Sequence, residues 1–253
     1  MIREYFSISE KGNVRENNED KVEVFENEYF TFAILCDGMG GHDFGEIASA
    51  VTITTLKTNF INYFKYINSV ETKKFFIETI NKVKIEFNNI AKLDPSKSNM
   101  GTTLVGALYI KSENKIYVFN IGDSRAYFLD TFGNLTQVTE DQNYGNLILK
   151  EIKTDANLEF DYKWKYLTSS VGRNVSTTVQ FFEFDANKVE IIKKIILTSD
   201  GLHDYVDKND IESILKKYSD LKIISSKLLE KAKINESDDN MSLVLLDFEA
   251  ENE

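Results

Sequence analysis

Several aspartates in this sequence directly follow runs of apolar residues. Asp37 follows FAILC, Asp123 follows IYVFNIG, and Asp200 follows IIKKIILTS. An ionised carboxylate at the end of a buried strand is costly to desolvate unless it is paired or binds a metal ion. Three repetitions of the same arrangement therefore predict that strand ends bring these carboxylates together around cations.

The chemistry of these segments suits a hard metal ion. Acidic residues sit at predicted turns or strand ends in five short stretches: residues 18–20, 37–41, 122–125, 199–201 and 238–240. Mg²⁺ and Mn²⁺ prefer carboxylate, carbonyl and water oxygens, and Gly38 would let a backbone carbonyl approach a cation. With one cysteine and two histidines, a zinc site of sulfur and nitrogen ligands is hardly feasible. Each motif alone is more often a turn or a helix cap, so only the set carries weight.

Composition narrows the class of protein. The formal net charge of −11 opposes attraction to phosphate backbones, so we expect no nucleic-acid binding. No apolar run is long enough to predict a membrane span, and the charged N-terminal stretch is unlike a secretory signal. We therefore expect a cytoplasmic protein that does not bind membranes. Cys36, the only cysteine, lies in an apolar run and is interpreted as a buried structural thiol.

The elements that must position the aspartates follow from hydrophobic periodicity. Successive short strands with tight turns favour antiparallel sheet, and two batches of helices favour outer layers. We expect an α+β fold, a four-layer α-β-β-α sandwich with two mostly antiparallel sheets and flanking helices. One domain spans residues 1–253, with a short divergent flap at about 140–175. The predicted strands are 29–36, 102–110, 115–120, 125–129, a short one before Thr139, 177–184, 195–199 and 241–248, and the predicted helices are 45–64, 76–90 and 221–232.

Taken in order, the motifs resemble those of the PP2C-like (PPM) family of metal-dependent protein serine/threonine phosphatases, particularly its compact bacterial members. The resemblance extends from about residue 3 to 248, and DGMGGH followed by GE and AS is its most specific part. It implies hydrolysis of phosphoserine and phosphothreonine in proteins that a serine/threonine kinase has phosphorylated. The matching segments are 12–15 (GNVR), 18–20 (NED), 37–42 (DGMGGH), 45–49 (GEIAS), 101–103 (GTT), 121–127 (IGDSRAY), 197–202 (LTSDGL) and 239–242 (DNMS).

The resemblance also implies a metal site with two Mn²⁺ or Mg²⁺ ions and a third, weaker one. Asp37 matches the aspartate whose carboxylate bridges the first two ions. The other implied ligands are Asp200 and Asp239 for the first ion, and the Gly38 carbonyl for the second, with Glu19 and Asp20 nearby, either directly or through waters.

Two further roles are implied by the same matches. Asp123 corresponds to the residue that helps Asp200 to hold the third ion. Arg15 corresponds to the arginine that grips the substrate phosphate, and its planar guanidinium suits that task. A hydroxide formed between the two ions would attack phosphorus, and the metals and Arg15 would neutralise the phosphoryl oxygens. Arg15 and Asp37 are thus the predicted catalytic residues.

The sequence departs from the family pattern in three places. Gln142 follows Asp141 where the family often has an Asp-His pair, and the stretch 142–168 is short and divergent. Met39 stands where many eukaryotic members have a histidine, so a metal-bound water would protonate the leaving group. His203 follows Leu202, where we interpret it as a surface residue or one just behind the site. His42 is interpreted as a capping or loop residue at a helix start.

Two other classes of function stay open at this point. A non-catalytic sensor with the same fold would bind phosphoproteins without turning them over, and a small-molecule phosphoesterase would act on nucleotides or other small phosphates. The retained acidic residues disfavour the sensor, because burying them without metal is costly. A P-loop NTPase is disfavoured because no GxxxxGK[ST] motif is present. We expect a monomer.

Overall fold

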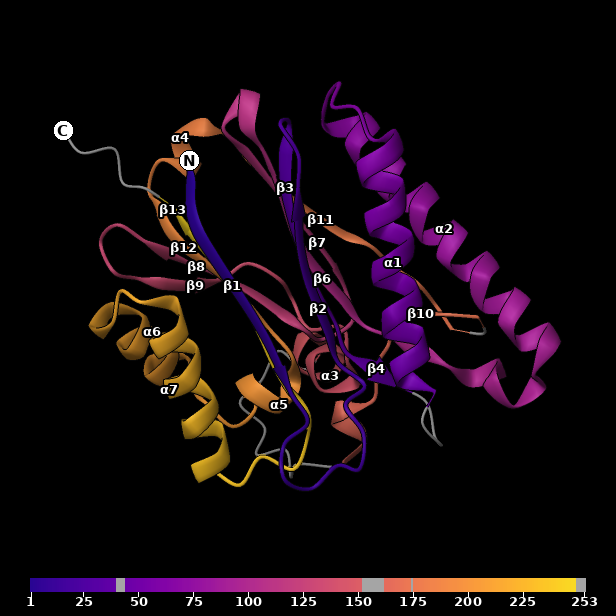
Figure 1. Cartoon of the computed structure of the whole chain (residues 1–253). Helices are drawn as coiled ribbons and strands as arrows, with labels where there is room; N and C mark the ends of the chain where they lie inside the picture. Colours follow the sequence, from indigo (N-terminus) through magenta and orange to yellow (C-terminus); the bar gives the residue numbers. More distant parts are fainter. Residues whose placement is uncertain (40–43, 152–161, 174, 249–253) are drawn as a thin grey trace.

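The computed structural model describes residues 1–39, 44–151, 162–173 and 175–248. Figure 1 shows two sheets face to face, with one pair of helices on each outer side. The helices α1 (Gly45–Tyr63) and α2 (Ser69–Leu93) cover one sheet, and α6 (Lys208–Lys217) and α7 (Leu221–Ile234) cover the other. The predicted four-layer α-β-β-α sandwich is therefore confirmed.

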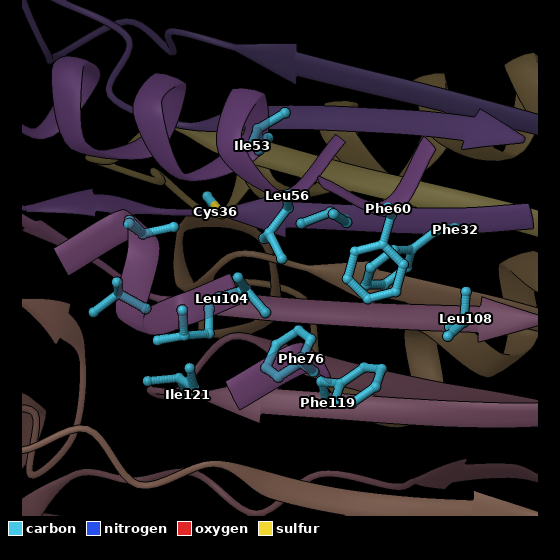
Figure 2. Packing of buried hydrophobic residues seen from close by; sticks show 14 of the residues in the cluster. Phe32, Cys36, Ile53, Leu56, Phe60, Phe76, Leu104, Leu108, Phe119 and Ile121 are labelled. Atoms are coloured by element: carbon cyan, nitrogen blue, oxygen red, sulfur yellow. The ribbon is translucent and has the colours of Figure 1, made fainter. Parts of the chain in front are cut away.

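The sheet under α1 and α2 has alternating faces, as the period of two along a strand requires. Phe32 and Phe119 point towards the helices, where they meet Phe60 of α1 and Phe76 of α2 (Figure 2). The rings of Phe76 and Phe119 are stacked, with their centroids 3.9 Å apart. The strands of this sheet, in spatial order and all antiparallel, are β11 (Gln180–Phe184), β7 (Lys115–Ile121), β6 (Leu104–Ile110), β3 (Phe30–Cys36) and β2 (Lys21–Glu26).

The second sheet is also antiparallel throughout its described pairs. Its face towards α6 and α7 buries Ile196 and Leu245 against Leu228 and neighbouring helical side chains. In spatial order its strands are β1 (Ile2–Glu10), β13 (Met241–Phe248), β12 (Ile192–Thr198), β8 (Arg125–Asp130) and β9 (Leu135–Gln137).

The core between the two sheets uses the opposite set of side chains from the same strands. Ala33 and Val118 from the first sheet pack with Ile195 and Val244 from the second. Most of the buried residues of this core are alanine or branched aliphatic residues, with Tyr109, Phe128 and Phe248 among them, whereas phenylalanines are more numerous in the layer beneath α1 and α2. This packing fixes the two sheets relative to each other.

The layered packing brings four chain segments to one edge of the sandwich. Strands β3 and β7 run in the same direction and end at Cys36 and Ile121. Strand β12 ends at Thr198, beside the start of β13. A small third sheet crosses this edge and consists of β10 (Val171–Gly172), β5 (Gly101–Thr102) and β4 (Gly38–Met39).

Most predicted elements are confirmed within a few residues, and the differences concern short or amphipathic elements. The sequence analysis did not delimit β1, β2 or α6. The predicted irregular flap contains a helix, α3 (Tyr144–Glu151), and a 3-10 helix, η3 (Tyr162–Lys165), while its residues 152–161 lie outside the described ranges. The other short helices are η1 (Pro95–Asn99), η2 (Lys111–Glu113), α4 (Ala186–Val189) and α5 (Asp200–His203).

Candidate functional site

The edge where the strands end forms an open cleft of about 870 Å³. It brings together residues that lie up to 224 positions apart in the chain, since Arg15 contacts Asp239. All but one of the predicted site residues line this cleft: Arg15, Glu19, Asp37, Gly38, Asp123, Asp200 and Asp239. The exception is Asp20, whose side chain lies behind the wall and is only 1% exposed.

Asp37 is held by its backbone. Its N–H donates to Thr103 Oγ1 at 3.1 Å, and its carbonyl accepts from the N–H of Thr103 and the hydroxyl of Thr102, both at 2.8 Å. Thr102 and Thr103 belong to the sequence GTT, so that motif fixes the end of β3. The Asp37 carboxylate is therefore presented to the cleft from a rigid strand end.

Two glycines allow three segments to approach one another beside Asp37. A Cβ on Gly38 would lie 2.2 Å from the Gly45 carbonyl oxygen, and a Cβ on Gly45 would lie 2.5 Å from Glu19 Oε2. No side chain tolerates such contacts. The Gly38 position, the start of α1 and the Glu19 carboxylate thus share one corner of the cleft because both positions are glycine.

Asn240 joins the C-terminal acidic segment to the N-terminal one. Its Oδ1 accepts from the backbone N–H of Glu19 at 2.9 Å, and its Nδ2 donates to the carbonyls of Lys11 and Asn17 at 2.8 and 2.9 Å. The sequence shows Asn240 as part of an Asp-Asn motif, but the motif alone indicated no role for it. Its role is to hold Glu19 and Asp239 on the same side of the cleft.

The carboxylates of the cleft raise one another's pKa values. Burial is the largest cause for each, and the negative neighbours add to it. The pKa of Asp20 is raised to about 7, with contributions from Asp200 and Asp239. The pKa of Asp123 is raised to about 8, with Asp200 as the next cause. The pKa of Asp200 is raised to about 6. Burial, Asp20, Asp200, Asp239 and Asp123 raise that of Asp37 well above its ordinary value.

Arg15 supplies a positive charge at the rim of the cleft. Its Nη2 donates to Asp239 Oδ2 at 2.6 Å, and its Nε donates to the carbonyl of Asp238 at 3.2 Å. Half of its side chain is exposed. An exposed guanidinium beside an acidic cluster is suited to recognising the oxygens of a phosphate.

The acidic residues fit a hard divalent cation by their chemistry. Two of their oxygens, Asp20 Oδ2 and Asp200 Oδ1, are buried and make no hydrogen bond to the described residues. Such oxygens are costly unless a cation or water satisfies them. Across residues 1–39, 44–151, 162–173 and 175–248, no group of three or more acidic, histidine or cysteine side chains is arranged so that it could hold a metal ion as it stands. The side chains of Asp37, Asp123, Asp200 and Asp239 nevertheless line one cleft.

The opposite wall of the cleft comes from the flap and was not predicted residue by residue. Lys165 of η3 donates to Asp204 Oδ2 at 3.0 Å and lies over the ring of Tyr205. Burial is the largest cause and lowers the pKa of Lys165, but the hydrogen bond to Asp204 and the negative charges of Asp204 and Asp200 together outweigh it, so the pKa is raised. Lys165 also lines the cleft. Because this stretch diverges from the family pattern, no motif in the sequence indicated Lys165.

The structure decides between the two alternatives given for His203. The surface position is wrong, because His203 is buried with 6% exposure, and the position just behind the site agrees with its place in α5, which begins at Asp200. Its Nδ1 lies 2.8 Å from Thr198 Oγ1, and burial lowers its pKa well below the ordinary value. It therefore packs behind Asp200 as a neutral ring. His42 lies outside the described residues.

The hydropathy of the helices gives a separate finding. Among the helices that the structure describes, none combines the length and the apolar character needed to cross a bilayer. Cys36 is buried, as predicted, and burial raises the pKa of its thiol.

Comparison with known proteins identifies the family. The sequence pattern of the family "Protein phosphatase 2C" matches residues 12–231, which is most of the chain. The chain is 29% identical to the serine/threonine phosphatase stp of Listeria monocytogenes over 242 residues, covering 94% of this chain and 93% of that one. The protein therefore belongs to the protein phosphatase 2C family.

Solved structures agree with this assignment. The serine/threonine phosphatase Stp1 from Staphylococcus aureus matches with a TM-score of 0.85 at 28% identity, covering 98% and 96% of the two chains. The catalytic domain of the serine/threonine protein phosphatase PstP in complex with two manganese ions matches with a TM-score of 0.76 at 26% identity, covering 96% and 97%. This chain is a protein serine/threonine phosphatase, an enzyme that acts on phosphoproteins.

Proposed function

We propose that this phosphatase works with two divalent cations, Mn²⁺ or Mg²⁺, held in the acidic cleft. Asp37, Asp200 and Asp239 with the Gly38 carbonyl would hold them. The observation that carries the proposal is the convergence of carboxylates whose pKa values are raised by burial and by one another. When bound, such ions would activate a water for attack on phosphorus and neutralise phosphoryl oxygens. The PstP relative contains two manganese ions, which supports the same stoichiometry.

The other residues of the cleft would bind the substrate phosphate and complete the surroundings of the cations. Arg15, at the rim, binds two phosphate oxygens with its planar fork and so orients the phosphoryl group. To do so it exchanges its ion pair with Asp239 for the substrate. Glu19 and Asp20 add negative charge beside and behind Asp37, and either directly or through waters they complete the cation environment.

Asp123 and Asp200 are proposed to share a third, weaker cation. The two carboxylates are electrostatically close, since Asp200 is the largest electrostatic contributor to the raised pKa of Asp123. Asp123 follows the β7 end and faces the same cleft. Asp123 follows the end of a different strand from Asp37 and is not among the ligands proposed for the first two ions. It is therefore the acid best placed to bind an ion separately from them.

The setting of the enzyme is also inferred. We propose that the substrates are proteins phosphorylated by a serine/threonine kinase and that residues 1–253 act as one domain and as a monomer in the cytoplasm, with no contact with nucleic acid or membrane. The acidic net charge of −11 supports the lack of nucleic-acid binding.

The proposal is tested by assaying purified protein on a panel of phosphothreonine and phosphoserine peptides with Mn²⁺, Mg²⁺ or EDTA. We expect phosphate release with either metal and none with EDTA. As a matched control, Asp185→Asn changes an exposed aspartate paired with Lys115 and should leave activity unchanged. Metal-independent release would refute the proposal. Faster hydrolysis of nucleotides than of phosphopeptides would favour a small-molecule phosphoesterase instead.

A further inference from the structure

The turn that carries Asp123 is held by the side chain and the backbone of Gln142. Gln142 Oε1 accepts from the N–H of Gly122 at 2.7 Å, and the N–H of Gln142 donates to the carbonyl of Gly122 at 3.0 Å. Gln142 thus engages both hydrogen-bonding groups of Gly122, and the Gly122 carbonyl also accepts from Asn120 Nδ2 at 3.1 Å. Because Gly122 directly precedes Asp123, these two bonds fix the direction in which the Asp123 side chain leaves the backbone.

The position of Gly122 leaves little freedom. Its φ is +111°, and a Cβ there would lie 2.7 Å from Thr103 Cγ2. Thr103 in turn accepts from the N–H of Asp37. The turn therefore rests on the residue that positions Asp37, so a small rotation of Gly122 would move Asp123 relative to Asp37.

Gln142 is also bonded to the wall of the cleft. Its Nε2 donates to the carbonyl of Thr178 at 3.0 Å, and its own carbonyl accepts from the N–H of Thr168 at 2.8 Å. Ser169 links the same two segments, because its hydroxyl accepts from the N–H of Thr178 at 2.9 Å. Thr168 and Ser169 line the cleft. Gln142 thus joins the Asp123 turn to the wall against which a substrate would lie.

We propose that Gln142 is a positioning residue of the phosphatase reaction, which holds Asp123 in place for its cation and couples that cation to the cleft wall lined by residues 167–170 and 175–176. The proposal rests on the cation role of Asp123 given above. A neutral carboxamide is suited to it, because one end accepts from Gly122 while the other donates to Thr178. Partners that orient a metal ligand usually matter for metal affinity almost as much as the ligand itself.

A second glutamine in the same region provides a matched control. Gln180 Oε1 accepts from the N–H of Glu140 at 3.2 Å, and its Nε2 donates to the carbonyl of Glu140 at 2.9 Å. It is thus another glutamine that clamps the backbone of one residue, and its Oε1 also accepts from Asn120 Nδ2 at 3.3 Å. Within the described part of the chain, Gln180 makes no hydrogen bond of its own to Gly122, Thr168 or Thr178. A change at Gln180 disturbs the neighbourhood without removing the proposed link.

The test compares Gln142→Met, Gln142→Glu and Gln180→Met in the full chain. Methionine keeps the length of the side chain and removes both of its hydrogen bonds. Mn²⁺ binding is followed by calorimetry, turnover of a phosphothreonine peptide by phosphate release, and the cleft wall by the fluorescence of Trp164, the only tryptophan, which lies in η3. Asp123→Asn is made alone and in combination with Gln142→Met.

We expect Gln142→Met to weaken the Asp123-dependent Mn²⁺ binding by about tenfold and to change the Trp164 emission, with little change for Gln180→Met. Adding Gln142→Met to Asp123→Asn should weaken Mn²⁺ binding no further, because both act through one cation. Gln142→Glu keeps the acceptor for Gly122 and loses the donor for Thr178. It should retain Mn²⁺ binding close to wild type while the KM for the phosphopeptide rises.

The inference is overturned if Gln142→Met binds Mn²⁺ as Gln180→Met does, or if its effect multiplies fully with that of Asp123→Asn. Should Gln142→Met fail to fold, a Gln142→Glu variant with unchanged KM and unchanged Trp164 emission would overturn the coupling to the wall. Loss of metal-dependent turnover in the wild type would instead refute the proposed function, and calorimetry of the variants separates the two failures.

Discussion

Two regions of this molecule contain buried carboxylates, and the negative charge is balanced differently in each. Towards the far end of the second sheet, Lys194 of β12 and Asp247 of β13 are paired across the strands and are 3% and 6% exposed. At the cleft, five aspartates share their surroundings, and the basic residues that line it are Arg15 and Lys165. The first region is neutral within the protein, whereas the second is completed by a ligand of opposite charge.

The two regions therefore differ in how their charges affect the stability of the fold. A buried ion pair that satisfies itself is close to neutral for folding, but removing one partner is strongly destabilising. An unbalanced acidic cluster instead costs stability in the metal-free protein, and the cost is recovered when a cation binds. Neutralising a carboxylate should therefore have opposite effects on stability in the two regions.

The largest effect is expected at Asp37. Asp37→Asn should lower turnover by more than about 10³-fold, beyond the loss of a single electrostatic donor in other active sites, because Asp37 is the ligand proposed to serve both cations. Its carboxylate also interacts with the charges of Asp20, Asp123, Asp200 and Asp239. At the same time the metal-free variant should be more stable than the wild type, since repulsion is relieved. Phosphopeptide assays and denaturant unfolding with EDTA measure both, and a variant that is both active and destabilised would contradict the comparison.

Asp247→Asn should show the reverse pattern. It leaves Lys194 buried without its partner and should cost about 3–5 kcal/mol of unfolding free energy, visible as a lower urea midpoint. Arg3, 3.9 Å from Asp247 and exposed, cannot compensate from within the core. Below the temperature of unfolding, turnover and Mn²⁺ dependence should match the wild type. Loss of turnover in the folded variant would show that the two regions are not independent.

Arg15→Ala should affect the reaction more than the fold. We expect a loss in kcat/KM of about 10²-fold, because the substrate phosphate loses its bidentate partner, with little change in stability because the side chain is half exposed. Arg15→Lys keeps the charge without the fork and should recover only part of the loss. Arg3→Ala, at the other end of the sandwich, serves as the arginine control and should leave kcat/KM unchanged.

The same electrostatics predict a pH dependence of stability. In the metal-free fold, Asp20, Asp123 and Asp200 have pKa values of about 7, 8 and 6, above the unfolded value of about 3.9. Between these limits the folded state binds more protons than the unfolded one, so stability falls as pH rises from about 4 to 8. Melting temperatures with EDTA should decrease over this range, and saturating Mn²⁺ should remove the decrease. A flat profile with EDTA would contradict the electrostatic account.

The part of the site that was predictable from the sequence is the part carried by strand ends. Asp37, Asp123 and Asp200 each follow an apolar run, and the structure places all three in one cleft, as that pattern indicated. The two-sheet architecture was predictable for the same reason, because strands such as β3 and β7 are buried on both faces and read as continuous apolar runs.

What could not be predicted depends on contacts between distant segments. The burial of Asp20, the ion pair of Arg15 with Asp239 and the clamp of Gln142 on Gly122 require knowing which loops face each other. Helix α6 was missed because its short amphipathic pattern lies in a charged stretch, and β1 because most of its residues are only partly buried and its pattern is mixed.

The central claim is that carboxylates from separate strand ends hold divalent cations in one cleft. It is tested most directly by anomalous diffraction from crystals grown with Mn²⁺ at a concentration that saturates turnover. The account predicts two strong manganese peaks flanking the Asp37 carboxylate, one of them also bonded to Asp200 and Asp239. Manganese bound only outside the cleft, in crystals of active enzyme, would contradict it.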